Sequence, residues 1–219
     1  MQHALPRRLA ACFGVLLAVV IVSGPGEAPV SKAVFNDTQK AALDRVSAYL
    51  NGIHLLKSGF IQLGPDGQLD QGEFLLEKPG KLRFEYNPPN PTLIVATGGK
   101  IYIKNGRLNT VDRYDISDTP LGLLLSDNVD LKTNAAVTGV DIRPDAVVVH
   151  ARTFNNRQQQ GVITMVFSNP GIELRQWTVK DNQGGTTEVA LRNPETTTGP
   201  VDETLFGVPQ KDPPRKASR

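Results

Sequence analysis

The chain has 219 residues, a length that suits one domain of ordinary size. Its formal charge of +2 comes from 24 Lys and Arg against 22 Asp and Glu, and the excess of cations lies entirely within residues 1–33. The remainder is neutral, which gives no electrostatic reason to expect nucleic acid as a partner. The only Cys also lies in the first segment, which excludes a disulfide scaffold and thiol chemistry in the rest of the chain.

Residues 1–33 have the pattern of a secretory signal peptide. Two arginines precede an apolar run from Leu9 to Val22, and small residues follow it. This run is shorter than the roughly 20 residues of a spanning helix, so a cleaved signal is favoured over a retained anchor. Cleavage after Ala33 is preferred to cleavage after Ala28.

The segment after the signal predicts one amphipathic helix. Asn36 or Asp37 is a suitable N-cap, and Gln39 stands three positions after Asn36, as in a capping box. Asn51-Gly52 is a suitable end. Apolar residues recur at helical spacing and form one stripe: Leu43, Val46, Leu50 and Ile53.

From residue 55 onward the hydrophobic period changes to two, which predicts strands. The clearest case is the stretch from Gly72 to Tyr86, where two strict alternations flank a turn at residues 78–81. One face of this hairpin is large and apolar and the other is charged, so the sheet faces water on one side. About ten or eleven antiparallel strands are expected, at residues 56–63, 71–78, 81–87, 92–96, 100–105, 107–115, 137–142, 146–151, 162–167, 173–180 and 186–191.

A short apolar segment interrupts these strands. Asp118 or Thr119 is a suitable N-cap and Pro120 suits the first helical position, which predicts a helix of about two turns. Such a helix is either part of the core or a lid over a ligand cavity, and the residues alone leave both open. A last short element is expected at residues 205–208, followed by a disordered tail over residues 210–219.

The chain has no residue pattern typical of catalysis. His54 and His150 are far apart in sequence, no Gly-x-Ser-x-Gly motif is present, and no ligands stand at metal spacing. Glu73 and Glu77 share a strand face, as glycosidase carboxylates would, but carboxylates that alternate with apolar residues more often form a solvated face. A binding protein without metal or cofactor is therefore favoured over an enzyme, with a hydrolase of unfamiliar type and a fully packed structural envelope protein as alternatives.

Several stretches resemble the LolA family of outer-membrane lipoprotein carriers. They are Phe60-Ile61-Gln62, the hairpin of residues 72–86, Thr119-Pro120-Leu121, Leu174–Asp181 and Thr204–Pro209. The resemblance covers about residues 36–209 and implies a domain over residues 34–209. Its implied fold is mainly β, an open and incomplete antiparallel barrel with a helical lid.

The resemblance also implies a function and a site. The function is that of a periplasmic, monomeric carrier that moves acylated lipoproteins from an inner-membrane ABC-type exporter to an outer-membrane receptor or membrane acceptor. An alternative is a related open barrel that senses lipid or regulates a partner without shuttling. The alternation in the strands predicts a cavity wall of Phe74, Leu76, Phe84, Tyr86, Ile101, Ile103 and Trp177. The lid is predicted to comprise Pro120, Leu121, Leu124 and Leu125.

The turn before the second strand of the hairpin departs from the family pattern. Many members carry an Arg before the Pro of this turn, where it holds the lid shut, whereas this chain has Lys78. Lysine keeps the charge but lacks the planar fork of arginine, which predicts a looser latch to the backbone of residues 121–128. Arg83 is the alternative latch, although the alternation places it on the charged face, where an ion pair with Glu73 or Glu85 is expected.

Overall fold

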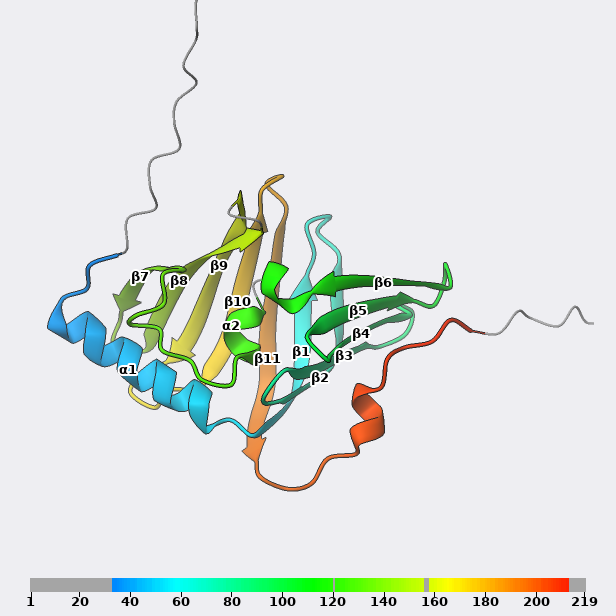
Figure 1. The fold of residues 1–219 in the computed structure, drawn as a ribbon, viewed down its shortest axis with the longest axis horizontal. Helices are drawn as coiled ribbons and strands as arrows, with labels where there is room; N and C mark the ends of the chain where they lie inside the picture. Colours follow the sequence, from blue (N-terminus) through cyan, green and yellow to red (C-terminus); the bar gives the residue numbers. More distant parts are fainter. Residues whose placement is uncertain (1–32, 120, 156–157, 213–219) are drawn as a thin grey trace, which may run out of the picture. The chain divides into compact units, whose positions relative to one another are not determined.

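The structure is a computed structural model that describes residues 33–119, 121–155 and 158–212. Eleven antiparallel strands of these residues form one sheet, in the order β6-β5-β4-β3-β2-β1-β11-β10-β9-β8-β7 (Figure 1). Within the described residues the outer strands β6 and β7 do not pair with each other, so the sheet is open, as predicted. The strands are β1 (Leu55–Leu63), β2 (Leu69–Glu77), β3 (Lys81–Tyr86), β4 (Thr92–Thr97), β5 (Lys100–Asn105), β6 (Thr110–Asp115), β7 (Val137–Ile142), β8 (Ala146–Asn155), β9 (Gln158–Ser168), β10 (Leu174–Asp181) and β11 (Thr186–Thr197).

The sheet consists of two meanders joined at one seam. Strands β1 to β6 follow one another as neighbours, and so do β7 to β11, because short turns connect each antiparallel pair. The seam is the pairing of β1 with β11, in which Phe60 lies opposite Leu191. A bulge between Lys57 and Gly59 interrupts this pairing. The bulge contains Asn193 of β11, which has a positive φ of 51°, and the pairing of β11 with β1 resumes beyond it.

Helix α1 (Asp37–Gly52) lies across the half of the sheet that contains β7 to β10 (Figure 1). Asn36 caps it, and its capping box with Gln39 is complete, as predicted. The predicted apolar stripe is buried against the sheet, since Leu43, Val46 and Leu50 are inaccessible to solvent. The helix therefore covers part of the apolar face of an otherwise one-layered sheet.

The apolar insert differs from the prediction. Residues Ile116–Asp118 form a 3₁₀ helix, η1, and only the single turn Gly122–Leu125 is α-helical, as α2. The predicted cap at Asp118 or Thr119 was therefore wrong, as was the length of two turns. The physical reason is that the Thr119 N–H donates to the Ile116 carbonyl and closes the 3₁₀ turn, so the chain has to restart at Leu121. Pro120 lies outside the described residues.

Three strands, β8, β9 and β11, are clearly longer than predicted. The polar stretch around residues 155–160 was expected to separate two strands, but β8 and β9 extend into it, and Asn155 pairs with Gln158. These strands are long because the main-chain hydrogen bonds between β8 and β9 continue beyond the apolar residues. A local pattern of hydrophobic residues does not predict such pairing. Strand β11 likewise runs on to Thr197, paired with Leu55.

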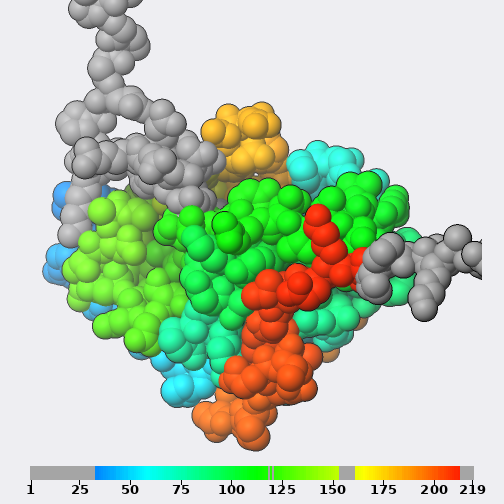
Figure 2. Space-filling view, turned by 45° about the vertical axis from the view of Figure 1, so that its right-hand side comes forward, coloured from blue at the N-terminus to red at the C-terminus, as the bar shows by residue number. Residues whose placement is uncertain are grey.

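The C-terminal residues cross the first meander, β1 to β6, on the face that carries Arg83, called here the outer face. The 3₁₀ helix η2 (Glu203–Phe206) packs on β3 and β4, and the chain then passes over the neighbouring strands (Figure 2). Asp212 pairs with Lys104 at 2.6 Å and exchanges hydrogen bonds with Asn109. These contacts attach Asp212 to β5 and to the β5–β6 turn, and the disordered tail over residues 210–219 stays a prediction. Residues 213–219 lie outside the described part.

Residues 1–32 of the predicted signal peptide also lie outside the described part, so the signal peptide stays a prediction. In the part that the structure does describe, no helix combines the length and the apolar character needed to cross a membrane. That part also contains no group of three or more His, Cys, Asp or Glu placed to hold a metal ion.

Candidate functional site

An apolar cavity of about 350 Å³ lies between the sheet and the segment that contains α2. The face of the sheet that forms it is the one with Phe84 and Trp177, called here the inner face. Almost all of the exposed lining is carbon, because the strands alternate between apolar inner and polar outer side chains. The lining residues are Gln62, Phe84, Tyr86, Ile94, Ile101, Ile103, Tyr114, Thr119, Leu121, Trp177, Val179, Thr187 and Val189.

The structure brings most of the predicted wall residues together. Five of them line the cavity: Phe84, Tyr86, Ile101, Ile103 and Trp177. Phe74 and Leu76 do not line it and are 2% and 0% exposed. Phe74 instead packs beneath the wall, with ring centroids 4.7 Å from Phe84 and 5.7 Å from Trp177. These two residues support the wall from the core.

The predicted lid residues divide in the same way. Leu121 lines the cavity. Leu124 and Leu125 are buried in the core, with exposed fractions of 0% and 3%. Leu121 is therefore the lid side chain that a bound molecule would meet, and the other two attach the segment to the domain.

Prediction from the sequence missed seven lining residues. Two of them carried a readable signal: Ile94 lies opposite Ile103 in register, and Val179 follows Trp177 by two positions. The others depend on which strands meet across the sheet. The missed residues are Gln62, Ile94, Tyr114, Thr119, Val179, Thr187 and Val189.

Two polar side chains of the wall, Tyr86 and Gln62, pair with each other. The Tyr86 hydroxyl donates to Oε1 of Gln62 at 2.8 Å. Burial raises the pKa of Tyr86 to about 12, with a smaller contribution in the same direction from the Asp70 carboxylate. The phenol is therefore neutral at physiological pH, and the cavity wall carries no charge from this residue.

The α2 segment is attached to the β2–β3 turn by a main-chain contact. The Gly80 N–H donates to the Leu125 carbonyl at 3.0 Å. Gly80 has a φ of 76°, in the left-handed region that only glycine adopts without steric cost, and this conformation directs its N–H toward α2. The segment that follows is attached to α1, because the Asn51 amide bonds both the N–H and the carbonyl of Val129.

Lys78 makes a different contact from the one predicted. Its Nζ donates to the Leu50 carbonyl, in the last turn of α1, at 3.0 Å. Within the described residues this ammonium group makes no hydrogen bond to residues 121–128. Burial lowers the pKa of Lys78, while the nearby Asp127 carboxylate acts in the opposite direction. The helix end offers unpaired carbonyls and so attracts the ammonium group, which explains the correction.

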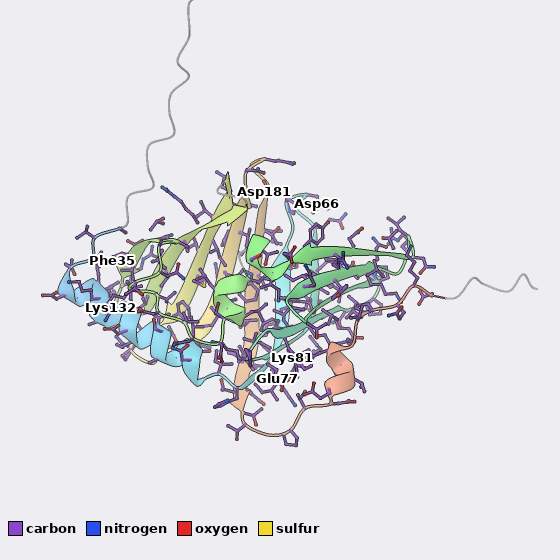
Figure 3. The ribbon with its side chains drawn as sticks, in the orientation of Figure 1. Phe35, Asp66, Glu77, Lys81, Lys132 and Asp181 are labelled. Atoms are coloured by element: carbon purple, nitrogen blue, oxygen red, sulfur yellow. The ribbon has the colours of Figure 1, made fainter. Side chains whose placement is uncertain are left out.

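Arg83 lies on the outer face, away from the cavity, and is not positioned as a latch. It pairs with Glu85 at 2.8 Å, one of the two partners expected, and its Nη1 donates to the Leu205 carbonyl. Lys81 bridges Glu77 at 3.3 Å and Glu203 at 2.6 Å on the same side of the hairpin (Figure 3). These cations hold η2 on the sheet.

An open β-sheet with an apolar cavity beneath a short helical segment has the geometry of a binding protein whose site suits an apolar molecule. The comparison with known families agrees with this class. The family of the outer membrane lipoprotein carrier protein LolA matches residues 51–208, most of the chain, and the chain belongs to this family.

The similarity to individual relatives is modest. An outer-membrane lipoprotein carrier protein from Dechloromonas aromatica is 30% identical over 166 residues, which cover 70% of this chain and 78% of the relative. A protein of the same name from Cupriavidus pinatubonensis is 25% identical over 207 residues, covering 87% and 95%. Among solved structures, a putative outer membrane lipoprotein-sorting protein domain from Vibrio parahaemolyticus matches with a TM-score of 0.46 at 8% identity, covering 77% of this chain and 96% of that one.

Proposed function

We propose that this protein is a periplasmic carrier that binds the acyl chains of lipoproteins and transfers them from the inner to the outer membrane. The observation that carries the proposal is the apolar cavity beneath α2, in a chain of the LolA family. The curated relatives named above are called outer-membrane lipoprotein carrier proteins. The proposed donor is an ABC-type exporter, and the proposed acceptor is a receptor or the outer membrane itself.

The physical need for such a cavity follows from the cost of exposing acyl chains to water. Each CH₂ group contributes about 0.8 kcal/mol on burial, so a long chain loses on the order of 10 kcal/mol when it enters water. Free diffusion of a lipoprotein between membranes is therefore negligible. A carrier has to keep the chains dry throughout and pass them on by direct contact.

We propose that the lid segment moves during loading, because the cavity is small. Its volume of about 350 Å³ is at the lower end of ligand pockets, which begin at roughly 300 Å³. Several acyl chains need more room than this. Opening the short α2 segment breaks the single hydrogen bond of Gly80 to Leu125, at about 1 kcal/mol, and exposes the buried Leu124 and Leu125, at roughly 2 kcal/mol each. Opening at this point is compatible with a closed state that is only modestly favoured.

The test of the function is a release assay. Spheroplasts that carry a newly made, labelled lipoprotein are incubated with the purified secreted protein. A carrier releases the lipoprotein into the supernatant as a soluble 1:1 complex. If the lipoprotein stays in the membrane although an established carrier releases it, the proposal is wrong.

A pair of variants on β5 links this release to the cavity. Ile103→Glu places a charge in the cavity wall and is expected to abolish release. Tyr102→Glu is the matched control, because adjacent residues of a strand point to opposite faces, and it is expected to retain release. Thermal denaturation of both variants checks that they are folded. Equal loss of release in two folded variants would contradict a role for the cavity.

A further inference from the structure

A second groove, of about 410 Å³, lies at the ends of the strands that form the cavity. Six of its nine lining residues have polar side chains, and we call it the polar groove. The turn between β1 and β2, the loop between β3 and β4, and the turn between β5 and β6 build it. Its lining residues are Gln68, Asp70, Pro89, Asn90, Pro91, Thr92, Asn105, Arg107 and Leu108.

The polar groove continues the apolar cavity along the same face of the sheet. Ile94 and Ile103 are register partners in the cavity wall, and the next pair on that face is Thr92 with Asn105, which lines the groove. Asp70 lies close enough to the wall to contribute to the raised pKa of Tyr86, after the larger effect of burial. A molecule that fills the cavity therefore has its outer end beside the groove.

Hydrogen bonds fix the walls of the polar groove. The Gly106 N–H donates to the Pro91 carbonyl at 3.1 Å, which joins the β5–β6 turn to the β3–β4 loop. Oδ1 of Asn105 accepts from the N–H groups of Arg107 and Leu108, both at 3.0 Å. The groove is thus preorganised, and little conformational entropy is lost when it binds a ligand.

The groove offers one cation and one anion that are free to bind a ligand. Within the described residues, neither the Asp70 carboxylate nor the Arg107 guanidinium has an ion-pair or hydrogen-bond partner. Other cations of this region are already engaged, as Lys104 is with Asp212. A guanidinium donates in a planar fork, which suits carbonyl oxygens, and a carboxylate accepts from an amide N–H.

We propose that the polar groove binds the head of an acylated lipoprotein, the ester and amide groups that join the acyl chains to its first residue. Arg107 donates to ester or amide carbonyls, and Asp70 accepts from an amide N–H. This inference rests on the proposed function, since it assigns the chains to the apolar cavity and the head to the groove beside it. It gives the carrier a means to prefer acylated peptides to simple lipids.

Two probes separate the head from the chains. One is a synthetic triacylated cysteinyl lipopeptide, and the other is a long-chain fatty alcohol, which has neither ester nor amide. Binding to the purified secreted protein is followed by the fluorescence of Trp177, the only tryptophan of the chain, which lines the cavity. The test variants are Arg107→Ala and Asp70→Ala, each of which removes the group that would bind the head. The control is Arg113→Ala, which removes an exposed arginine of β6 outside the groove.

Each test variant is expected to weaken lipopeptide binding about tenfold, the effect of losing one charge-assisted hydrogen bond. Binding of the fatty alcohol should stay unchanged, and the control should bind both probes like the wild type. Unchanged lipopeptide binding, or equal weakening for both probes, would overturn the inference while leaving the carrier function intact. If the wild type binds neither probe, the proposed function fails, and this inference fails with it.

Discussion

At the scale of single residues, Lys78 contacts helix α1 and not the segment of residues 121–128 that its sequence position suggests. Its ammonium group caps the C-terminal end of α1 through the Leu50 carbonyl, and the neighbouring Gly80 contacts the lid through its main chain. The β2–β3 turn is therefore a junction between helix and lid. We propose that Lys78 affects the lid indirectly, by holding this turn in place.

Replacing Lys78 with Leu tests this role. The change removes the hydrogen bond to α1, and we expect the free energy of unfolding to fall by about 1 kcal/mol, because relief of the desolvated charge offsets part of the loss. Urea denaturation measures the effect. Lys57→Leu, at an exposed position of β1, is the control and should leave the stability within about 0.5 kcal/mol. Equal stability of the Lys78→Leu variant and the wild type would contradict the capping role.

The raised pKa of Tyr86 predicts that the protein loses stability in alkaline solution. Its folded pKa of about 12 is higher than the ordinary value of 10.0, so the folded state binds the phenolic proton more tightly than the unfolded state does. The resulting stabilisation is complete below pH 10 and disappears as the pH rises through 12. Tyr86→Phe should flatten the decline between these values, as measured by urea denaturation across the pH range. An unchanged slope in this variant would show that other groups cause the decline.

At the scale of elements, the C-terminal segment is separate from the cavity although it packs against the same sheet. Phe206 is 3% exposed on the outer face, and Lys81 lies 5.6 Å from the centroid of its ring. The Glu203–Lys81 pair and the Arg83–Leu205 contact add polar links on either side. We therefore expect η2 to stabilise the strands without shaping the ligand site.

Phe206→Ala tests this separation. Removal of a buried phenyl ring should lower the free energy of unfolding by about 3 kcal/mol and accelerate hydrogen exchange in residues 198–212. Binding of the fatty alcohol at a temperature where the variant is folded should match the wild type. A large loss of binding in the folded variant would show that the outer face is coupled to the cavity.

At the scale of the whole molecule, one seam holds the two meanders together. The described residues belong to one compact unit, and β1 with β11 is the pair of strands that joins its halves. Ser58 bridges the bulge in this seam, because its hydroxyl donates to the Arg192 carbonyl at 2.9 Å and accepts from the Arg192 N–H at 3.1 Å. Loss of this hydroxyl leaves the partly buried N–H and carbonyl of Arg192 without this partner.

Ser58→Ala should therefore destabilise the complete sheet. We expect a fall of about 2 kcal/mol in the free energy of unfolding, with one cooperative transition and an unchanged dependence on urea concentration. Circular dichroism and Trp177 fluorescence, recorded on the same samples, should give coincident curves. Separate transitions from the two signals would mean that the meanders unfold independently and that the seam is not the link between them.

The sequence by itself determined the local structure of this protein. Alternation along the strands, the Asn36 capping box and the Pro-Gly turn are short-range signals, and the strands from β1 to β7 and helix α1 lie close to their predicted positions. The same alternation separated inner from outer side chains, so it placed Phe84 and Ile103 correctly in one wall and Arg83 on the opposite face.

Only the tertiary structure decided which of the apolar residues remain accessible. Phe74 and Phe84 have the same pattern in the sequence, yet one is core and the other lines the cavity, because accessibility depends on what α2 and the opposite strands cover. Contacts across long stretches of chain, such as Lys78 with Leu50 and Asp212 with Asn109, follow from the order of strands in the sheet. A local period of two specifies the face of each side chain, whereas the neighbours on that face come from the pairing of distant strands.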